Sequence, residues 1–400
     1  MLRVLTLSTL FPDHTRPNFG IFVERQTRGL AEAYDVEVRV AAPIGLPPGP
    51  LALIHHAEKL TLPPRETWRG LDVYRPRFTT IPGVGGRWHA HHLQRALEPL
   101  LDAIRRDFPF DVIDASFFFP DGPAAVALGA RYDVPVSIKA RGADVHHWGS
   151  ATATSSQVIG AGQAADGLLA VSAAMRDDMI ALGMPVDRIR VHHTGVDLDR
   201  FRIVDRAAAK AALGVEGPLV LSLGALIPRK GHHLVIHAVA ALPGVSLAIA
   251  GEGPERERLI AYAEELGMGD RLHILGGVAH ESLPAVLAAA DVMALASASE
   301  GLANAWLEAL ACGTPIVISN VGGAGEVVTS PEAGRIVPRN PANFAVGIAD
   351  LLANPPARHA VRAAAERFTW AANTVALVDH LSALVARNRV TAAVRQASRG

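Results

Sequence analysis

The sequence has very little cysteine, no surplus of charge and no long uninterrupted apolar run. Cys312 is the single cysteine among 400 residues, which excludes a disulfide framework and fits a reducing compartment. Lys and Arg number 38 against 39 Asp and Glu, so the net charge of −1 excludes the basic footprint of a nucleic-acid-binding protein. The longest apolar stretch, 283–298, contains Pro284 and Asp291 and is too short to cross a bilayer. These absences favour a cytoplasmic protein.

The composition predicts a folded chain of two domains. Half of the residues are hydrophobic and only 19% are charged, which excludes disorder as the main state. The length of 400 residues exceeds the size at which one hydrophobic core keeps growing. The 36 glycines and 27 prolines are typical of many short loops between strands and helices.

Short, continuous apolar runs alternate with helical periods in both halves of the chain. Runs of this kind are typical of strands buried on both faces of a parallel sheet. The alternation therefore predicts an α/β protein with two doubly wound, Rossmann-like domains that face a cleft. In the first half we expect strands at 3–8, 36–42, 71–75, 112–115, 136–140, 167–171 and 189–192. In the second half we expect them at 219–223, 246–250, 272–275, 292–296, 315–318 and 335–337.

The domain boundary is expected in the polar segment 194–216, before the first strand of the second half. We assign 1–200 to an acceptor-binding domain and 201–370 to a donor-binding domain. A final helical stretch, 357–389, has no strand after it, so 371–400 is expected to be a helix with a basic tail that packs back on the first domain. A frayed terminus is the alternative for the tail.

The most informative motif is SEGLANAWLEALACGTP, from Ser299 to Pro315, which follows an apolar strand and opens a helix. Glu300 and Glu308 lie eight positions apart in it. Gly301 lets a ligand approach the backbone, and a helix N-terminus offers N–H groups and positive dipole charge. This combination suits a sugar diphosphate, since carboxylates accept from hydroxyls. The alternative is that Glu300 caps the helix and Glu308 lies on a solvated face.

A second motif, Pro-Arg-Lys-Gly at 228–231, follows the first strand of the second half. Arg229 supplies a planar fork and Lys230 a point charge, and both suit a diphosphate. The alternative is a solvated basic turn. The glycine-rich turns at 251–254 and 322–326 are weak signals, and neither is the dinucleotide fingerprint, which disfavours a nicotinamide dehydrogenase.

Taken together, these motifs resemble the donor domain of retaining glycosyltransferases of family four, which have the two-domain GT-B fold. The first half agrees, because 8–26, 118–122 and 140–144 resemble the branch that includes teichuronic-acid-type and other bacterial exopolysaccharide transferases. Thr194-Gly195-Val196-Asp197 with Phe201 resembles the linker motif of the family. The resemblance covers nearly the whole chain.

The resemblance implies a role for each matching residue. Lys230 would bind the diphosphate of a nucleotide sugar, Glu308 would accept from the ribose hydroxyls, and Glu300 would hold hydroxyls of the donor sugar. The remaining donor contacts implied are the backbone of Gly301, Leu302, Ala303 and Asn304 at the phosphate–sugar junction, Gly20 closing over the diphosphate, and Gly277 and Val278 at the base.

Two positions depart from the pattern of the family. Ala225 stands where many members carry Arg, so one phosphate ligand is missing and Arg229 would replace it. Arg141 stands where many members carry His, and this permanent cation would bind the diphosphate or an anionic acceptor. Asp144 is either a polar contact near the reacting centre or a turn cap.

The implied function is retaining transfer of a hexosyl unit from a UDP- or GDP-sugar, without metal or other cofactor. The implied acceptor is a saccharide or lipid-linked molecule in cell-surface polysaccharide synthesis. A sugar-nucleotide epimerase and a catalytically inactive nucleotide-sugar-binding protein are the alternatives. The five adjacent histidine pairs do not predict a metal site, because neighbours in sequence face apart. The helix expected near 87–106 would either contact anionic lipid, as a peripheral membrane surface, or pack on a core.

Overall fold

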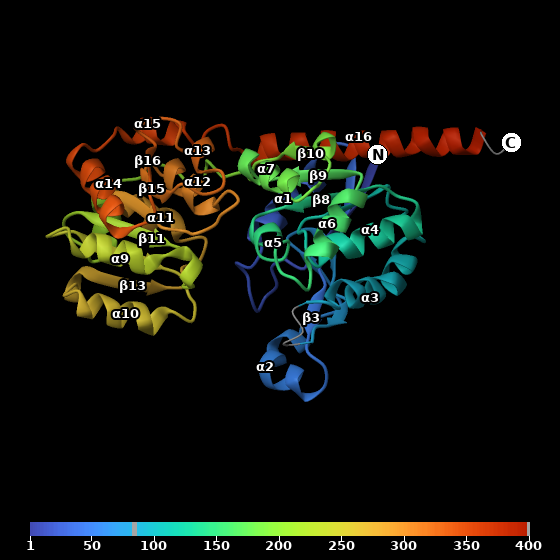
Figure 1. Cartoon of the computed structure of the whole chain (residues 1–400), viewed down its shortest axis with the longest axis horizontal. Helices are drawn as coiled ribbons and strands as arrows, with labels where there is room; N and C mark the ends of the chain where they lie inside the picture. Colours follow the sequence, from blue (N-terminus) through green and yellow to red (C-terminus); the bar gives the residue numbers. More distant parts are fainter. Residues whose placement is uncertain (82–85, 398–400) are drawn as a thin grey trace. The chain divides into compact units, whose positions relative to one another are not determined.

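The computed structural model describes residues 1–81 and 86–397, and these residues form two compact units (Figure 1). The first unit comprises Met1–His193 together with the chain from Trp370 onward, and the second comprises Thr194–Thr369. The sequence division at 200/201 therefore falls a few residues inside the second unit. The linker motif at 194–201 belongs to the unit that carries the two glutamates.

The first unit contains an eight-stranded sheet in the order β10-β9-β8-β7-β1-β2-β5-β4. Its strands are β1 (Leu2–Leu7), β2 (Val36–Ala41), β4 (Arg65–Trp68), β5 (Leu71–Tyr74), β7 (Val112–Ala115), β8 (Val136–Ala140), β9 (Gly167–Ala170) and β10 (Ile189–Val191). All neighbours are parallel except β4 and β5. The strands β3 (Ile44–Leu46) and β6 (Arg77–Thr79) form a separate small parallel sheet.

The helices of this unit are α1 (Ile21–Glu32), α2 (Pro50–Leu60), α3 (His89–Ile104), α4 (Asp121–Tyr132), α5 (Ala143–His146), α6 (Ser155–Ala164), α7 (Ala173–Ala181) and α16 (Trp370–Ala397), with a 3₁₀ turn at Val186–Arg188. The apolar stripe of α3, which includes Leu93, Leu97 and Leu101, is fully buried. Of the two alternatives for the helix expected near 87–106, this burial supports packing on a core.

The second unit has a six-stranded, all-parallel sheet in the order β13-β12-β11-β14-β15-β16. Its strands are β11 (Leu219–Leu223), β12 (Ser246–Ala250), β13 (Leu272–Gly276), β14 (Val292–Leu295), β15 (Ile316–Ser319) and β16 (Gly334–Val337). Its helices are α8 (Arg206–Ala212), α9 (His232–Ala240), α10 (Arg256–Glu265), α11 (Leu283–Ala289), α12 (Asn304–Ala311), α13 (Ala324–Val327), α14 (Pro341–Ala353) and α15 (Arg358–Ala363), with 3₁₀ turns at Pro228–Lys230 and Gly269–Arg271. The doubly wound α/β architecture is thus confirmed in both units.

Both sheets reverse their strand order beside their first strand. In the first unit β1 lies between β2 and β7, and in the second β11 lies between β12 and β14. Ligands of open α/β sheets bind at the carboxyl ends of the strands that flank such a switch point. The loops after β11 and β14 are the ones that carry the two charged motifs of the second unit.

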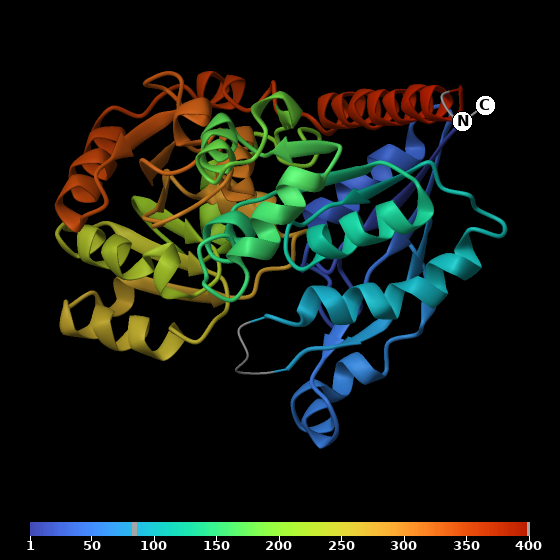
Figure 2. The ribbon, with the colours of Figure 1, turned by 45° about the vertical axis from the view of Figure 1, so that its right-hand side comes forward.

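The C-terminal helix returns to the first unit, which confirms that expectation. Leu377, Leu381 and Val385 of α16 are buried in one cluster with Val4 and Val112 of the sheet. In Figures 1 and 2 the red helix runs beside the first unit. Residues 398–400 of the basic tail lie outside the described residues.

The helix expected over 357–389 is interrupted between α15 and α16. The Phe368 carbonyl accepts a hydrogen bond from the Val196 N–H at 2.7 Å, and Thr369 pairs with Val196 as an isolated bridge. This pairing with a remote segment lies at the point where the helix is interrupted. Within the described residues, no helix combines the length and the apolar character that a bilayer span requires.

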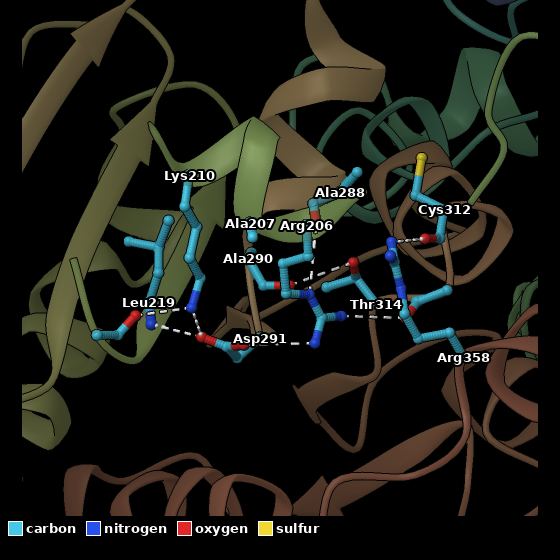
Figure 3. Close-up of polar contacts among 12 residues, drawn as sticks. Arg206, Ala207, Lys210, Leu219, Ala288, Ala290, Asp291, Cys312, Thr314 and Arg358 are labelled. Atoms are coloured by element: carbon cyan, nitrogen blue, oxygen red, sulfur yellow. Dashed lines mark hydrogen bonds and ion pairs between the residues drawn. The ribbon is translucent and has the colours of Figure 1, made fainter. Parts of the chain in front are cut away.

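The amino ends of the strands in the second unit are held by an ionic cluster (Figure 3). Asp291, just before β14, pairs with Lys210 Nζ at 2.5 Å and with Arg206 at 3.3 Å, both from α8. The same carboxylate accepts the Leu219 N–H at 2.8 Å. This cluster fixes α8 at the end of the sheet opposite to the loops that follow β11 and β14.

Candidate functional site

The charged motifs of the second unit meet at the switch point of its sheet. Lys230 ends the short 3₁₀ turn that follows β11, and Glu300 lies in the loop that follows β14. Lys230 Nζ lies 2.5 Å from Glu300 Oε1, and the Ser297 hydroxyl donates to the same oxygen at 2.7 Å. The structure therefore brings together the lysine and one of the two glutamates that the sequence singled out.

The Lys230–Glu300 ion pair is largely withdrawn from water. The side chain of Lys230 is 15% exposed and that of Glu300 is 9% exposed. Partial burial strengthens such a charge-assisted bond, but each ion also loses hydration. The solvated-turn interpretation of Lys230 is therefore wrong, and so is the helix cap at Glu300, because the residue that caps α12 is Ala303.

Arg229 supports the loop that carries Glu300. Its guanidinium donates to the Ser299 carbonyl at 2.5 Å and lies 3.7 Å from Glu300 Oε2. Its own carbonyl accepts from the Ala298 N–H at 2.8 Å. The position where the family carries Arg, Ala225, is exposed at the end of β11. Replacement of that missing arginine by Arg229 stays a prediction.

A neutral histidine fixes the start of α9 beneath this site. His232 Nε2 lies 3.2 Å from the Ala225 carbonyl oxygen, which can only accept, so Nε2 carries the proton. Its Nδ1 then accepts from the Ser222 hydroxyl at 2.9 Å. Burial lowers the pKa of His232 to about 4, which keeps the ring neutral at physiological pH.

Two glycines let the loops around Glu300 approach one another. Gly231 has φ +69°, and a Cβ there would overlap the Ala296 carbonyl oxygen at the end of β14. Gly322, after β15, has φ +50°, and a Cβ there would overlap the Glu300 carbonyl oxygen. The neighbouring Gly323 N–H donates to the Gly301 carbonyl at 2.8 Å. The turn at 322–326, weak as a sequence signal, is thus part of the support for Glu300.

Glu308 lies on α12, and its side chain is 12% exposed, so it does not lie on a solvated face. Its Oε1 accepts a hydrogen bond from His280 Nε2 at 3.1 Å. The helix begins at Asn304, directly after Gly301, Leu302 and Ala303, which are buried. N–H groups in the first turn of a helix have no acceptor within it, so this end can bind an anion.

The loop after β13 carries the residues assigned to the base. Gly277 and Val278 lie there, and a Cβ on Gly277 would lie 2.7 Å from Glu252 Oε1. His280, two residues beyond Val278, reaches Glu308 from the same loop. Contact of Gly277 and Val278 with a base stays a prediction. Sequence reasoning missed Ser297 and His280, whose residue types carry no signal without their loop partners.

In the first unit, Arg141 follows β8 and is held by three contacts. Its Nε donates to the Ser116 carbonyl at 2.6 Å, and a terminal nitrogen donates to Gln26 Oε1 at 3.3 Å. Its guanidinium carbon lies 4.9 Å from the centre of the Phe22 ring. Burial lowers the pKa of Arg141 to about 10, so it is still a cation at pH 7.

Asp144 and Gly20 shape the backbone of the first unit. The buried Asp144 carboxylate accepts the N–H groups of Arg141, Gly142 and Phe118 at 2.7–3.1 Å, and burial raises its pKa. These are the contacts of a turn cap. Gly20 is buried just before α1, against the Leu10 carbonyl. A polar contact of Asp144 at the reacting centre and closure of Gly20 over a diphosphate stay predictions.

Solved structures place this architecture in the GT-B class. A sucrose-phosphate synthase from Thermosynechococcus elongatus superposes with a TM-score of 0.82 at 21% identity, over 97% of this chain and 100% of that chain. Anabaena HepE in complex with UDP-glucose superposes with a TM-score of 0.71 at 21% identity, over 96% and 100%. At such identities the likeness establishes the fold.

Family comparison then assigns each part of the chain. Residues 20–200 match the model of Glycosyltransferase Family 4, and residues 204–368 match that of Glycosyl transferases group 1. The two matches together cover most of the chain, which carries these two glycosyltransferase domains in succession. The D-inositol 3-phosphate glycosyltransferase of Mycobacterium leprae (strain Br4923) is 39% identical over 206 residues, 48% of this chain and 48% of that protein. The one of Mycobacterium tuberculosis (strain F11) has the same identity over 48% and 43%. The match spans about half the length of these relatives.

Proposed function

We propose that this protein is a retaining glycosyltransferase that moves a hexosyl unit from a UDP- or GDP-sugar to a saccharide or lipid-linked acceptor. The two family domains and the GT-B fold support transfer from a nucleotide sugar. The observation that carries the proposal is the Lys230–Glu300 pair at the switch point of the second sheet. A finer role in cell-surface polysaccharide synthesis rests on the teichuronic-acid-type motifs of the first half.

A nucleotide sugar offers a substitute for each partner of this ion pair. A diphosphate oxygen would replace Glu300 as the anion at Lys230, and sugar hydroxyls would replace Lys230 as donors to Glu300. The burial of both groups then strengthens their interactions with the donor. UDP-glucose is the ligand named for the HepE structure, which supports a donor of this class.

The mechanism we propose needs no protein nucleophile and no metal. Lys230 and the N-terminus of α12 would stabilise the charge that develops on the departing diphosphate. An oxygen of that diphosphate would take the proton of the acceptor hydroxyl on the same face of the sugar, which retains the anomeric configuration. Asp144, as a backbone cap, is not needed in this step.

Arg141 favours an acceptor that bears negative charge. Its cation is fixed by Ser116 and Gln26 at the carboxyl end of β8. The mycobacterial relatives carry the name of a phosphorylated acceptor, inositol 3-phosphate. A phosphate on the acceptor, or on its lipid link, would meet this guanidinium with bidentate geometry.

The test compares two partly buried lysine–carboxylate pairs at opposite ends of the same sheet. Lys230→Ala removes the cation at the carboxyl ends of the strands, and Lys210→Ala removes the cation that pairs with Asp291 at the amino ends. We expect Lys230→Ala to lower turnover of the preferred donor at least ~100-fold, as loss of one transition-state donor does. The Lys210→Ala protein should keep its turnover per folded molecule.

The assay measures release of nucleoside diphosphate from UDP-glucose and GDP-mannose, with an acceptor panel of free, phosphorylated and lipid-linked saccharides. The donor base is chosen beforehand by thermal shift with UDP, GDP and ADP, since a bound ligand raises apparent stability. Equal turnover in both variants would refute the assigned site. Epimerised donor without transfer, or binding without turnover, would favour the two alternative functions.

A further inference from the structure

The carboxylate of Glu308 is oriented by a second element of its unit. His280 Nε2 lies 3.1 Å from Glu308 Oε1, and His280 is 8% exposed. A carboxylate only accepts, so Nε2 is the donor. This bond fixes the rotation of the carboxylate about its last side-chain torsion, which is otherwise broad. The bond uses Oε1, so Oε2 is the oxygen that would accept from a ligand.

The His280 ring is itself held by the linker motif. The ring of Phe201 is fully buried and meets the imidazole edge to face, with centroids 5.3 Å apart and planes at 85°. Aromatic pairs prefer this arrangement, and close packing leaves little room for the ring to turn. Phe201 therefore restricts the direction in which His280 presents its N–H.

A single guanidinium joins the linker motif to the helix that carries Glu308. Arg362 of α15 donates to the carbonyls of Phe201 at 2.6 Å and Leu198 at 2.8 Å. It also donates to the carbonyl of Ala311, the last residue of α12. A cation at this end complements the helix dipole. The linker, the loop after β13 and α12 are thus connected through contacts that converge on Glu308.

We propose that His280 and Phe201 are positioning residues that orient Glu308 toward the ribose hydroxyls of the donor. This inference rests on the proposed function, in which Glu308 accepts from those hydroxyls. Two vicinal hydroxyls need the carboxylate plane in one orientation, and a freely rotating carboxylate loses part of that binding. The linker motif then contributes to recognition of the sugar of the nucleotide without touching it.

The experiment measures ribose recognition separately from overall affinity. The probes are UDP, GDP and ADP, each with its 2′-deoxy and 3′-deoxy analogues, titrated calorimetrically into the full chain. His280→Phe keeps a ring against Phe201 but removes the donor, and His280→Gln keeps a donor to Glu308. Phe201→Leu loosens the packing around the His280 ring but keeps the His280 N–H that donates to Glu308. Glu308→Ala is the reference for complete loss of ribose recognition.

We expect the wild-type protein to prefer ribose over deoxyribose about tenfold or more, as loss of a hydrogen bond to a charged group predicts. Glu308→Ala and His280→Phe should lower this preference at least fivefold, and Phe201→Leu about threefold. His280→Gln should keep it within twofold. Affinity for the deoxy analogues should change little in any folded variant.

Three outcomes would overturn the inference. If His280→Phe and Phe201→Leu keep the preference while Glu308→Ala loses it, His280 has no positioning role although the proposed function stands. If His280→Phe weakens the binding of ribose and deoxyribose nucleotides by the same factor, the role of His280 is structural. If the wild-type protein binds none of the probes, the proposed function fails and the inference fails with it. Phe201→Leu decides the case if His280→Phe does not fold.

Discussion

The position of the Glu300 carboxylate depends on a backbone approach at Gly322. A Cβ on this residue would overlap the Glu300 carbonyl oxygen, and φ is +50°. We predict that Gly322→Ala displaces the Glu300 loop and lowers turnover at least ~10-fold, with a stability cost of about 2–3 kcal/mol from strain and overlap. Donor turnover and urea unfolding of the purified variant measure the two effects.

Gly244→Ala is the matched control for this change. Gly244 has φ +76°, but nothing lies within 4 Å of a Cβ built there. This variant should therefore show only the backbone penalty, about 1 kcal/mol, with normal turnover. If both variants turn over the donor alike, the contact between Gly322 and the Glu300 loop has no part in the site.

At the residue scale, the sequence predicts charged groups better than it predicts their partners. Lys230 and Glu300 were identifiable because each follows a buried strand and carries charge. His280 and Ser297 were not, because a histidine or serine in a loop is ordinary until tertiary contact places it beside a carboxylate. The turn at 322–326 could be predicted from its glycines, but its contact with the loop of Glu300 could not.

At the scale of elements, buried strands were predicted almost to the residue, since a continuous apolar run marks both their place and their length. The predicted strand at 219–223 coincides with β11. The group formed by β3, β6 and α2 was not predicted, because its strands have only three residues each and α2 is mostly exposed. At the break before α16 the Phe368 carbonyl accepts from Val196, a partner remote in sequence that local patterns do not reveal.

The packing of α16 on the sheet of the first unit can be tested with two substitutions on this helix. Leu381 is fully buried against the sheet of the first unit, whereas Val375 on the same helix is 61% exposed. We predict that Leu381→Ala destabilises the docked helix by about 2–5 kcal/mol, and that Val375→Ala changes it by less than about 0.5 kcal/mol. Hydrogen exchange across α16 measures the difference, and equal protection in both variants would contradict the packing.

The same helix should respond to acid through His380. Its Nε2 lies 3.1 Å from the Ser137 hydroxyl, and burial lowers its pKa from 6.5 to about 4, with smaller contributions from Arg190 and Arg387. The unfolded chain thus takes up a proton near pH 6.5 while the folded chain does not. Stability contributed by this group is full above pH 6.5 and is lost as pH falls toward 4.

We therefore predict that His380 contributes a loss of about 2 kcal/mol in α16 docking when the pH falls from 7 to 5. In His380→Gln, which cannot titrate, this pH dependence should be smaller by that amount. The measurement is hydrogen exchange of α16 at both pH values. The raised pKa values of Asp114, about 6, and Asp121, about 7, act in the opposite direction in both proteins, so the difference isolates His380. Identical pH profiles would contradict the prediction.

At the scale of the whole molecule, the two units repeat one plan and carry different chemistry. Each sheet reverses its order beside its first strand, and the loops after the strands on either side of that point lie at one edge of the sheet. The second unit offers a cation, two carboxylates and a helix N-terminus. The first unit contributes Arg141, whose guanidinium donates to the Ser116 carbonyl and to Gln26 Oε1. The alternation of strands and helices along the sequence predicts this plan. The identity of the donor and the acceptor depends on the shape of the pocket, which local sequence patterns do not encode.

This division of chemistry leads to a test with Arg141. We predict that Arg141→Met lowers turnover about 100-fold or more while the affinity for UDP, GDP or ADP stays within twofold, because in the proposed function this cation binds a charged acceptor. Arg141→Lys should recover only part of the rate, since an ammonium cannot keep both the Ser116 and Gln26 bonds in the fork geometry. Arg106→Met, a change at an exposed arginine of the same unit, is the control and should behave as the wild type. Steady-state rates over a range of acceptor concentrations and calorimetric nucleotide titrations give the two quantities. A parallel loss of nucleotide affinity would instead assign Arg141 to the diphosphate of the donor.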